Sequence, residues 1–130
     1  MNVLESARRA KAAALQLAAI DSKTKNQALE LCIEMLQERR EEIFRANEAD
    51  LLQSQRDELA LPLQKRLRFD QNKLDEVISG LRSLQGLADP VGQTLAATQL
   101  AEGLDLYRVS CPIGVIGMIF ESRPDALVQI

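Results

Sequence analysis

The sequence predicts an incomplete α/β fold: N-terminal helices, then a β-hairpin, then the first strand of a dinucleotide-binding sheet. Apolar residues recur at helical spacing as far as Gly86, whereas residues 94–109 alternate between apolar and polar. Residues 113–120, IGVIGMIF, are one continuous apolar run, as in strands buried on both faces. Apolar residues make up 46% and charged residues 27% of the chain, which is typical of a folded domain.

The composition excludes several kinds of site. The chain has no histidine and two cysteines, Cys32 and Cys111, so it holds the parts of neither a zinc site nor a His-dependent triad. We expect both cysteines to be small core residues. A net charge of −3 favours no nucleic-acid partner, and no apolar run is long enough for a bilayer. We therefore expect a cytoplasmic protein without metal, nucleic-acid or membrane contacts.

The N-terminal region predicts two amphipathic helices. One face of the first carries Leu4, Ala7, Ala14 and Ala18. Side-chain oxygens of Asp21, Ser22 and Thr24 suit the next N-terminus, and Thr24 with Gln27 has the spacing of a capping box. The second helix carries an apolar stripe that Ile43 and Phe44 prolong: Leu29, Cys32, Ile33 and Leu36.

Further helical signals follow. A short helix is expected over residues 49–55, and Pro62 suits the first turn of another. Asp70 is a good N-cap, and Gly86 is expected to end that helix in a left-handed conformation. Between them lies a regular four-point stripe: Leu74, Val77, Ile78 and Leu81.

Residues 93–111 predict a β-hairpin. The pair Glu102-Gly103 resembles a turn, and strand-forming residues lie on both sides of it. Leu104, Leu106 and Arg108 are expected on one face. Pro112 should keep the two residues before it extended.

The apolar run is followed by ESRPDALVQI, in which Ser122 suits an N-cap and Pro124 a first helical turn. Ligands of open α/β sheets bind beyond the carboxyl ends of strands, where helix N-termini attract anions. Arg123 suits bidentate binding of a phosphate or carboxylate there. The alternative is a capping Ser122 beside a local ion pair of Glu121 and Arg123, and spacing does not decide between them.

Two closing motifs carry a family resemblance. PIGVIGMIFESRPDALVQI, preceded by AEGLDLYRVSC, closely resembles glutamate-5-semialdehyde dehydrogenases, the gamma-glutamyl phosphate reductases of the aldehyde dehydrogenase superfamily. EEIFRANEADLL and RLRFDQNKLDEVISGL extend the resemblance. It implies an aldehyde dehydrogenase-like fold with three parts: a helical region (1–92), an oligomerisation-type hairpin (93–111) and the incomplete start of an NADP-binding strand–turn–helix (112–130).

The resemblance also implies an activity: NADPH-dependent reduction of L-glutamyl 5-phosphate to L-glutamate 5-semialdehyde and phosphate, in L-proline biosynthesis. The nucleophilic cysteine of the family lies downstream of this motif, and neither Cys32 nor Cys111 stands in its context. We therefore expect an N-terminal fragment that is inactive by itself. The alternative is a non-catalytic helical interaction module.

Site residues and partners follow from the same resemblance. Substrate or oxyanion binding falls to Ser122 and Arg123, taken as a pair because the register depends on which residue anchors the match. Ile119, Phe120 and Glu121 are placed near NADPH. The implied partners are the small-molecule substrate, further copies of the chain in a homo-oligomer, and glutamate 5-kinase.

Overall fold

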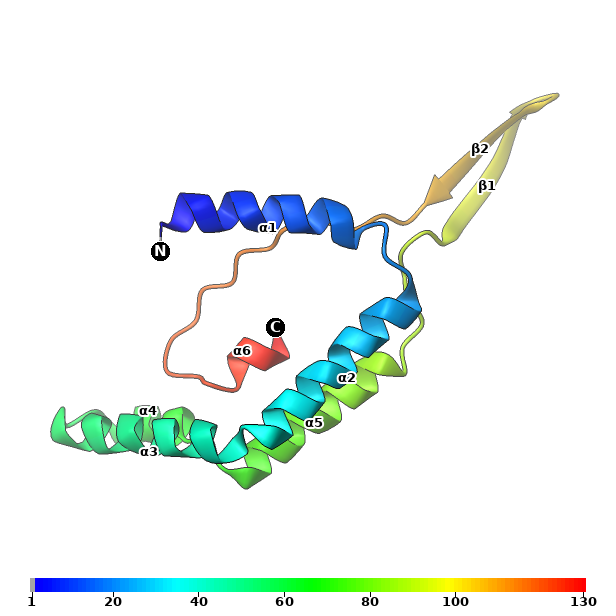
Figure 1. Cartoon of the computed structure of the whole chain (residues 1–130). Helices are drawn as coiled ribbons and strands as arrows, with labels where there is room; N and C mark the ends of the chain where they lie inside the picture. Colours follow the sequence, from blue (N-terminus) through cyan, green and yellow to red (C-terminus); the bar gives the residue numbers. More distant parts are fainter. Residues whose placement is uncertain (1) are drawn as a thin grey trace. The chain divides into compact units, whose positions relative to one another are not determined.

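The computed structural model describes residues 2–130, which fall into two compact units. The hairpin unit contains the chain up to Thr24 together with Ala88–Gly117, and the helical unit contains Lys25–Leu87 together with Met118–Ile130. Figure 1 shows the elements in chain order: α1 (Val3–Leu17), α2 (Ser22–Glu38), α3 (Arg40–Arg56), α4 (Leu61–Leu67), α5 (Gln71–Gln85), β1 (Thr94–Ala101), β2 (Leu104–Val109) and α6 (Ala126–Gln129).

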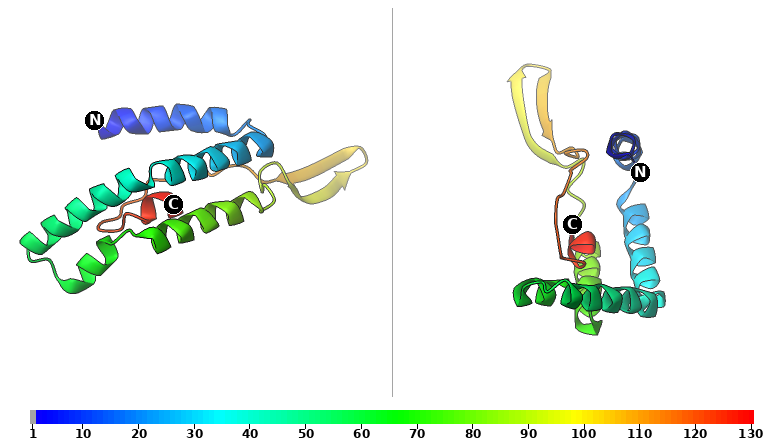
Figure 2. Two further views of the ribbon diagram at one scale, coloured as in Figure 1. Left: turned by 60° about the horizontal axis from the view of Figure 1, so that its bottom comes forward. Right: turned by 90° about the vertical axis from the view of Figure 1, so that its left-hand side faces the viewer.

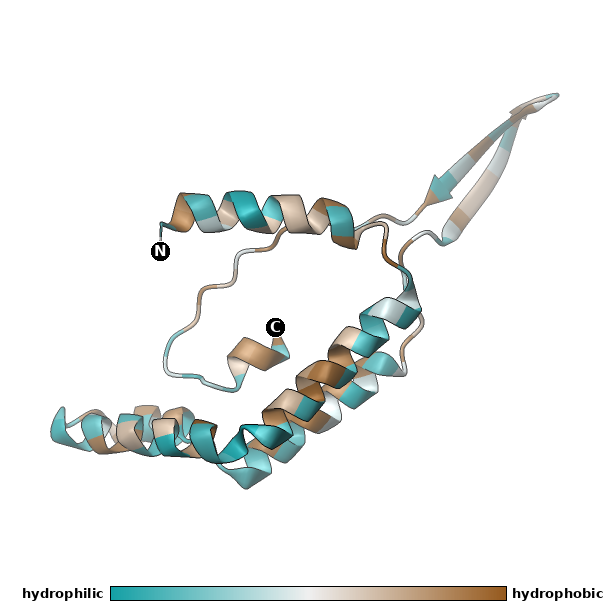
Figure 3. Ribbon diagram, viewed as in Figure 1, coloured by the Kyte–Doolittle hydropathy of each residue, from teal (hydrophilic) through white to brown (hydrophobic). Residues whose placement is uncertain are grey.

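The helical unit is built around α2 and α5, which lie side by side in every view (Figure 2). Two hydrogen bonds join them near one end: Asn26 Nδ2 donates to the Gln85 carbonyl at 3.3 Å, and Gln85 Nε2 donates to the Asn26 carbonyl at 3.0 Å. The four predicted stripe residues of α5 are buried in one core, to which α2 contributes Ile33 and the linker before α5 contributes Phe69: Ile33, Phe69, Leu74, Val77, Ile78 and Leu81. Figure 3 shows the apolar residues collected along α2.

Helix α3 differs from the prediction because it is one continuous helix, not an extension of α2 followed by a short piece. The chain leaves helical geometry at Arg39, where φ is −96° and ψ is 14°, and this turn separates α2 from α3. Ile43 and Phe44 still pack against the core, but from α3. The break redirects the chain while keeping Ile43 and Phe44 packed against the core.

A buried amide fixes the entry into α5. Asn47 is only 6% exposed; its Nδ2 donates to the Leu67 carbonyl at 2.8 Å, and its Oδ1 accepts from the Phe69 N–H at 2.7 Å. Both the Nδ2 and the Oδ1 atom of the side-chain amide therefore have hydrogen-bond partners, so burial of Asn47 leaves neither atom unsatisfied. Asn47 holds the linker between α4 and α5 against α3.

The predicted helix ends are partly correct. Asp21 Oδ1 accepts from the Thr24 N–H at 2.8 Å and Asp70 Oδ1 from the Lys73 N–H at 3.2 Å, so both are N-caps. The Thr24–Gln27 capping box is wrong because the helix already begins at Ser22. The left-handed Gly86 is also wrong: its φ is −77°, and its N–H bonds back to the last turn of α5.

In the hairpin unit, β1 and β2 pair antiparallel as predicted, with Ala97 opposite Tyr107 and Thr98 opposite Leu106. Gly103 has φ +76°, which the tight turn needs and which glycine adopts without strain. All residues of both strands are exposed. Helix α1 also has no buried residue, so its predicted apolar face, Leu4 included, remains open within the described chain.

The predicted strand over residues 113–120 is wrong. The segment has no regular secondary structure, and Ile113 and Ile119 are 91% and 102% exposed. A strand needs neighbours to receive its backbone hydrogen bonds, and the described residues offer it none. The β-branched residues therefore indicate a preference for strand conformation, but no neighbouring strand is present in residues 2–130 to pair with them. Across residues 2–130, every helix is too short or too polar to cross a membrane.

Candidate functional site

The five residues predicted from the sequence lie together in the segment that precedes α6. Ile119, Phe120, Glu121 and Arg123 are exposed, and Ser122 is half-buried. This segment belongs to the helical unit, because the chain rejoins that unit at Met118. The turn is held next to α5, because α6 packs against α5 and Asp125 lies beside Lys73.

Ser122 is the conformational centre of the turn. Its φ is +54°, a left-handed conformation that non-glycine residues seldom adopt and that costs on the order of 1–3 kcal/mol. The predicted N-cap role is wrong, since α6 begins only at Ala126 with Asp125 before it. The Ala126 N–H bonds to the Arg123 carbonyl at 3.1 Å, which closes the turn. The reversal at Ser122 lets Asp125 reach α5 while Arg123 stays exposed.

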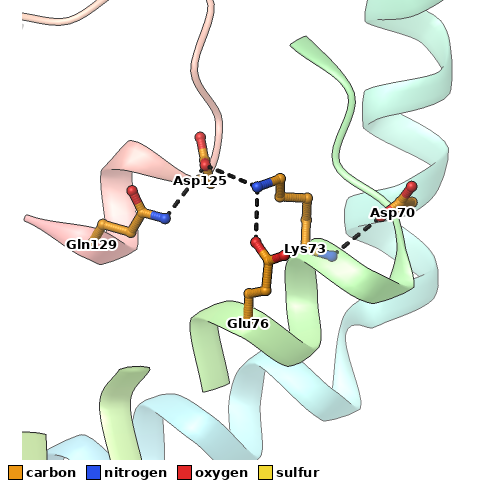
Figure 4. Close-up of polar contacts among 5 residues, drawn as sticks. All are labelled: Asp70, Lys73, Glu76, Asp125 and Gln129. Carbon is orange, nitrogen blue, oxygen red and sulfur yellow. Dashed lines mark hydrogen bonds and ion pairs between the residues drawn. The ribbon is translucent and has the colours of Figure 1, made fainter. Parts of the chain in front are cut away.

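Asp125 connects this turn to α5 (Figure 4). It is 8% exposed; its Oδ2 lies 3.9 Å from Lys73 Nζ and accepts from Gln129 Nε2 at 3.4 Å. Lys73 Nζ also bonds to Glu76 Oε2 at 2.8 Å. The hydrogen bond to Glu76 and its negative charge raise the pKa of Lys73 above 10.5, and the carboxylates of Asp125 and Asp70 act in the same direction. Lys73 is therefore fully protonated at neutral pH.

Further basic side chains lie around the contact between Lys73 and Asp125. A cavity of about 550 Å³ is lined by four basic side chains and one acid, and we call it the basic pocket: Lys65, Arg66, Lys73, Arg123 and Asp125. The last turn of α4 supplies Lys65 and Arg66, and the first turn of α5 supplies Lys73. The alternative of an ion pair between Glu121 and Arg123 receives no support, because no such pair forms among the described residues. Arg123 instead faces a pocket of like charge.

An apolar groove of about 620 Å³ lies elsewhere in the helical unit. Cys32, Met35 and Leu36 of α2 line it together with Leu81, Leu127 and Val128. The prediction that Cys32 is a core residue is wrong, because the side chain lies at the open edge of the stripe and is exposed. Cys111 is exposed as well, in the irregular segment after β2.

Comparison with known proteins decides the relationship. No family model matches this chain. The gamma-glutamyl phosphate reductases of Pelotomaculum thermopropionicum and Acetivibrio thermocellus are 57% and 55% identical to it over all 130 residues. The chain is homologous to gamma-glutamyl phosphate reductases. It spans 30% of the length of these two relatives.

Solved structures agree with the sequence relatives. The crystal structure of the Thermotoga maritima gamma-glutamyl phosphate reductase matches with a TM-score of 0.94 at 35% identity, over 98% of this chain and 31% of that one. The Saccharomyces cerevisiae reductase matches with a TM-score of 0.90 at 34% identity, over 95% and 31%. The predicted resemblance is confirmed, and so is the predicted order of helices followed by a hairpin, which corresponds to the N-terminal part of the reductase structure.

Residues 119–121, which the reductase resemblance places near NADPH, form only one edge of such a site within residues 2–130. Ile119 is fully exposed, Glu121 is exposed, and Phe120 keeps 45% of its surface exposed. A Cβ added at Gly114 or Gly117 would meet nothing within 4 Å, so neither glycine marks a close-fitting cradle. The segment that the resemblance places near the cofactor is therefore mostly exposed among the described residues.

Sequence analysis located the turn that carries Arg123 but assigned no role to the basic side chains of Lys65, Arg66 and Lys73. The available signal was the cluster QKRLRF at the end of a short helix that begins with proline. This cluster does not indicate that its side chains lie near Arg123, which is more than 50 positions further along the chain.

Proposed function

We propose that this chain forms part of an enzyme that reduces L-glutamyl 5-phosphate to L-glutamate 5-semialdehyde and phosphate, with NADPH, in L-proline biosynthesis. The observation that carries the proposal is 57% identity over every residue to a gamma-glutamyl phosphate reductase. The TM-score of 0.94 to the Thermotoga maritima enzyme supports it. The Glu-Ser-Arg-Pro turn lies within the matched region.

The Ser122–Arg123 pair is proposed to act on the acyl phosphate group. A cysteine thiolate from outside this chain attacks the acyl carbon; a C–S bond forms, and the C–O bond to phosphate breaks with its electron pair leaving on phosphate. Negative charge develops on the carbonyl oxygen during the attack. Fixed donors at this turn would stabilise that oxyanion, which is often the largest catalytic contribution of an active site.

Ile119, Phe120 and Glu121 are proposed to lie near NADPH in the complete enzyme. The proposal rests on the resemblance and on the position of these residues directly before the Ser122 turn. NADPH, when bound, supplies the hydride. In that setting residues 112–130 begin the cofactor-binding part and residues 1–92 form the helical region.

Residues 93–111 are proposed to contact another copy of the chain in a homo-oligomer. An isolated two-stranded hairpin is only marginally stable in water, yet this one exposes many apolar side chains: Leu95, Leu100, Leu104, Leu106, Tyr107 and Val109. Sedimentation at increasing protein concentration tests the proposal. We expect association that is lost when Leu104 and Leu106 are both changed to Lys, and a wild-type monomer at every concentration would contradict it.

Two further assignments follow from the substrate. An acyl phosphate is reactive towards water, which favours direct transfer from the enzyme that makes it, and we propose glutamate 5-kinase as that partner. We propose the cytoplasm as the compartment of both. Co-purification of the kinase with the complete reductase tests the first assignment, and cell fractionation tests the second.

The central experiment is a chimera in which this chain replaces the 130 matching residues of the Pelotomaculum thermopropionicum reductase. We expect phosphate-dependent reduction of NADP⁺ with glutamate 5-semialdehyde, and no turnover by the isolated 130-residue chain. A folded chimera without activity would contradict the proposal and favour a non-catalytic helical interaction module. The unmodified relative is the matched control for expression and assay.

A further inference from the structure

We propose that the basic pocket binds a phosphate group, and that its ligand in the reaction is the phosphoryl group of the acyl phosphate. The choice of this ligand rests on the proposed function. Phosphate binding itself rests only on the geometry and charge of the helical unit, so the two claims are tested separately.

The pocket is assembled from three elements of one compact unit. Lys65 and Arg66 come from the end of α4, Lys73 from the start of α5, and Arg123 from the turn before α6. Its volume of about 550 Å³ lies within the usual range for small-molecule sites, roughly 300–1,000 Å³. A phosphate group and part of the molecule attached to it therefore fit.

Three of the four cations are available to a ligand. Lys65, Arg66 and Arg123 form no ion pair and no side-chain hydrogen bond within residues 2–130. Each guanidinium presents up to five N–H donors in a planar fork that matches phosphate oxygens. Only Lys73 is engaged, by Glu76 and Asp125. A dianion with several acceptor oxygens satisfies this arrangement better than a single carboxylate does.

Asp125 is the one acid in the pocket, and its contacts explain how an anion site tolerates it. Its Oδ2 accepts from Gln129 and faces Lys73, and the side chain is nearly buried. Its negative charge is therefore partly compensated within the protein. Glu76 and Asp70 are the other acids near Lys73. A phosphate should bind on the side of Lys65, Arg66 and Arg123, away from these three carboxylates.

The position of Arg123 connects this pocket to the proposed chemistry. It directly follows Ser122, whose left-handed backbone forms the turn. In an acyl phosphate, one oxygen separates the phosphorus atom from the reacting carbonyl carbon. A site that holds the phosphoryl group beside Arg123 therefore holds the carbonyl near the Ser122–Arg123 pair, and it stabilises the charge on the departing phosphate.

The same chemistry has a second source in the proposed reaction, the 2′-phosphate of NADPH. Two probes distinguish them: acetyl phosphate carries an acyl phosphate without a nucleotide, and 2′-AMP carries the nucleotide phosphate. Inorganic phosphate is the reference probe for the pocket itself. All three are titrated into the 130-residue chain, and backbone amide chemical shifts are followed by NMR.

We expect inorganic phosphate to shift amides near residues 65–66, 73 and 123, more strongly as the pH rises and the dianion replaces the monoanion. Lys65→Gln with Arg66→Gln should weaken binding roughly tenfold, as should Arg123→Gln. Arg45→Gln is the matched control, because Arg45 is exposed in the same unit but does not line the pocket, and it should leave the dissociation constant unchanged. Asp125→Asn should tighten binding by removing the acid.

Each contrary result overturns a defined claim. No phosphate-induced shift, or shifts that survive the Lys65, Arg66 and Arg123 changes, would refute the pocket as a phosphate site even if the chimera is active. Tighter binding of 2′-AMP than of acetyl phosphate would refute its assignment to the acyl phosphate. If phosphate binds as described but the chimera is inactive, the basic pocket is a phosphate site and the proposed function is refuted.

Discussion

The two units of this chain bury their apolar residues to very different extents. In the helical unit, Ile33 and Leu74 are each 1% exposed and belong to one core with four other buried side chains. In the hairpin unit, every residue of both strands is exposed, and so is Ile113 in the segment that follows. Helices form most of their backbone hydrogen bonds internally, whereas a hairpin satisfies only one edge of each strand. The helical unit is therefore the stable framework, and the hairpin unit presents surface.

The largest expected effect contrasts one apolar residue from each unit. Leu74→Ala should lower the free energy of unfolding by about 3 kcal/mol, because it removes buried contacts and leaves a cavity. Leu106→Ala in the exposed hairpin should change it by less than about 0.5 kcal/mol. Urea unfolding followed by circular dichroism measures both. Similar losses for the two variants would show that the hairpin is as tightly packed as the helical core.

A smaller effect is expected at the polar contact that fixes the start of α5. Asn47→Ala should lower the free energy of unfolding by about 2 kcal/mol, because it leaves the buried Phe69 N–H and the Leu67 carbonyl without partners. Asn72→Ala, on the exposed side of α5, is the control and should have little effect. Equal unfolding curves for the two variants would contradict the claim that the Asn47 hydrogen bonds stabilise the helical unit.

A gain in stability is expected at the end of α3. The Leu59 N–H bonds to the Ser54 carbonyl at 3.0 Å and the Glu58 N–H to the Gln55 carbonyl at 3.2 Å, a Schellman motif in which Glu58 has φ +50°. Glu58→Gly should raise the free energy of unfolding by about 1 kcal/mol, because glycine adopts this φ without strain. Glu48→Gly, inside the same helix, should lower it by about 1 kcal/mol. If Glu58→Gly destabilised the protein as Glu48→Gly does, the Schellman motif at the end of α3 would be contradicted.

The smallest effect is a dependence on pH at the contact between α5 and the turn before α6. The raised pKa of Lys73 means that protonated Lys73 favours the folded state. This contribution is complete below pH 10.5 and is lost as the pH rises through the higher folded value. An NMR titration of Lys73 should show its pKa above that of the Glu76→Gln variant. A lower or equal value in the wild type would contradict the contact.

The same contrast explains what the sequence revealed. The α5 stripe and the cap at Asp70 were correct because both depend on residues within a few positions of each other. The Glu-Ser-Arg-Pro turn was located, but the strand before it was wrong because a strand depends on neighbours that residues 2–130 do not contain. Glutamate gives no signal for the left-handed conformation of Glu58. The basic pocket escaped prediction because only the folded unit brings Arg66 to Arg123.

The most direct test of the central claim is the apparent KM for phosphate in the reductase chimera, measured in the direction of NADP⁺ reduction. For Arg123→Gln we expect this KM to rise roughly tenfold while the KM for NADP⁺ is unchanged, because the guanidinium binds phosphate in the basic pocket. An unchanged KM for phosphate in an active Arg123→Gln chimera would contradict that role of Arg123.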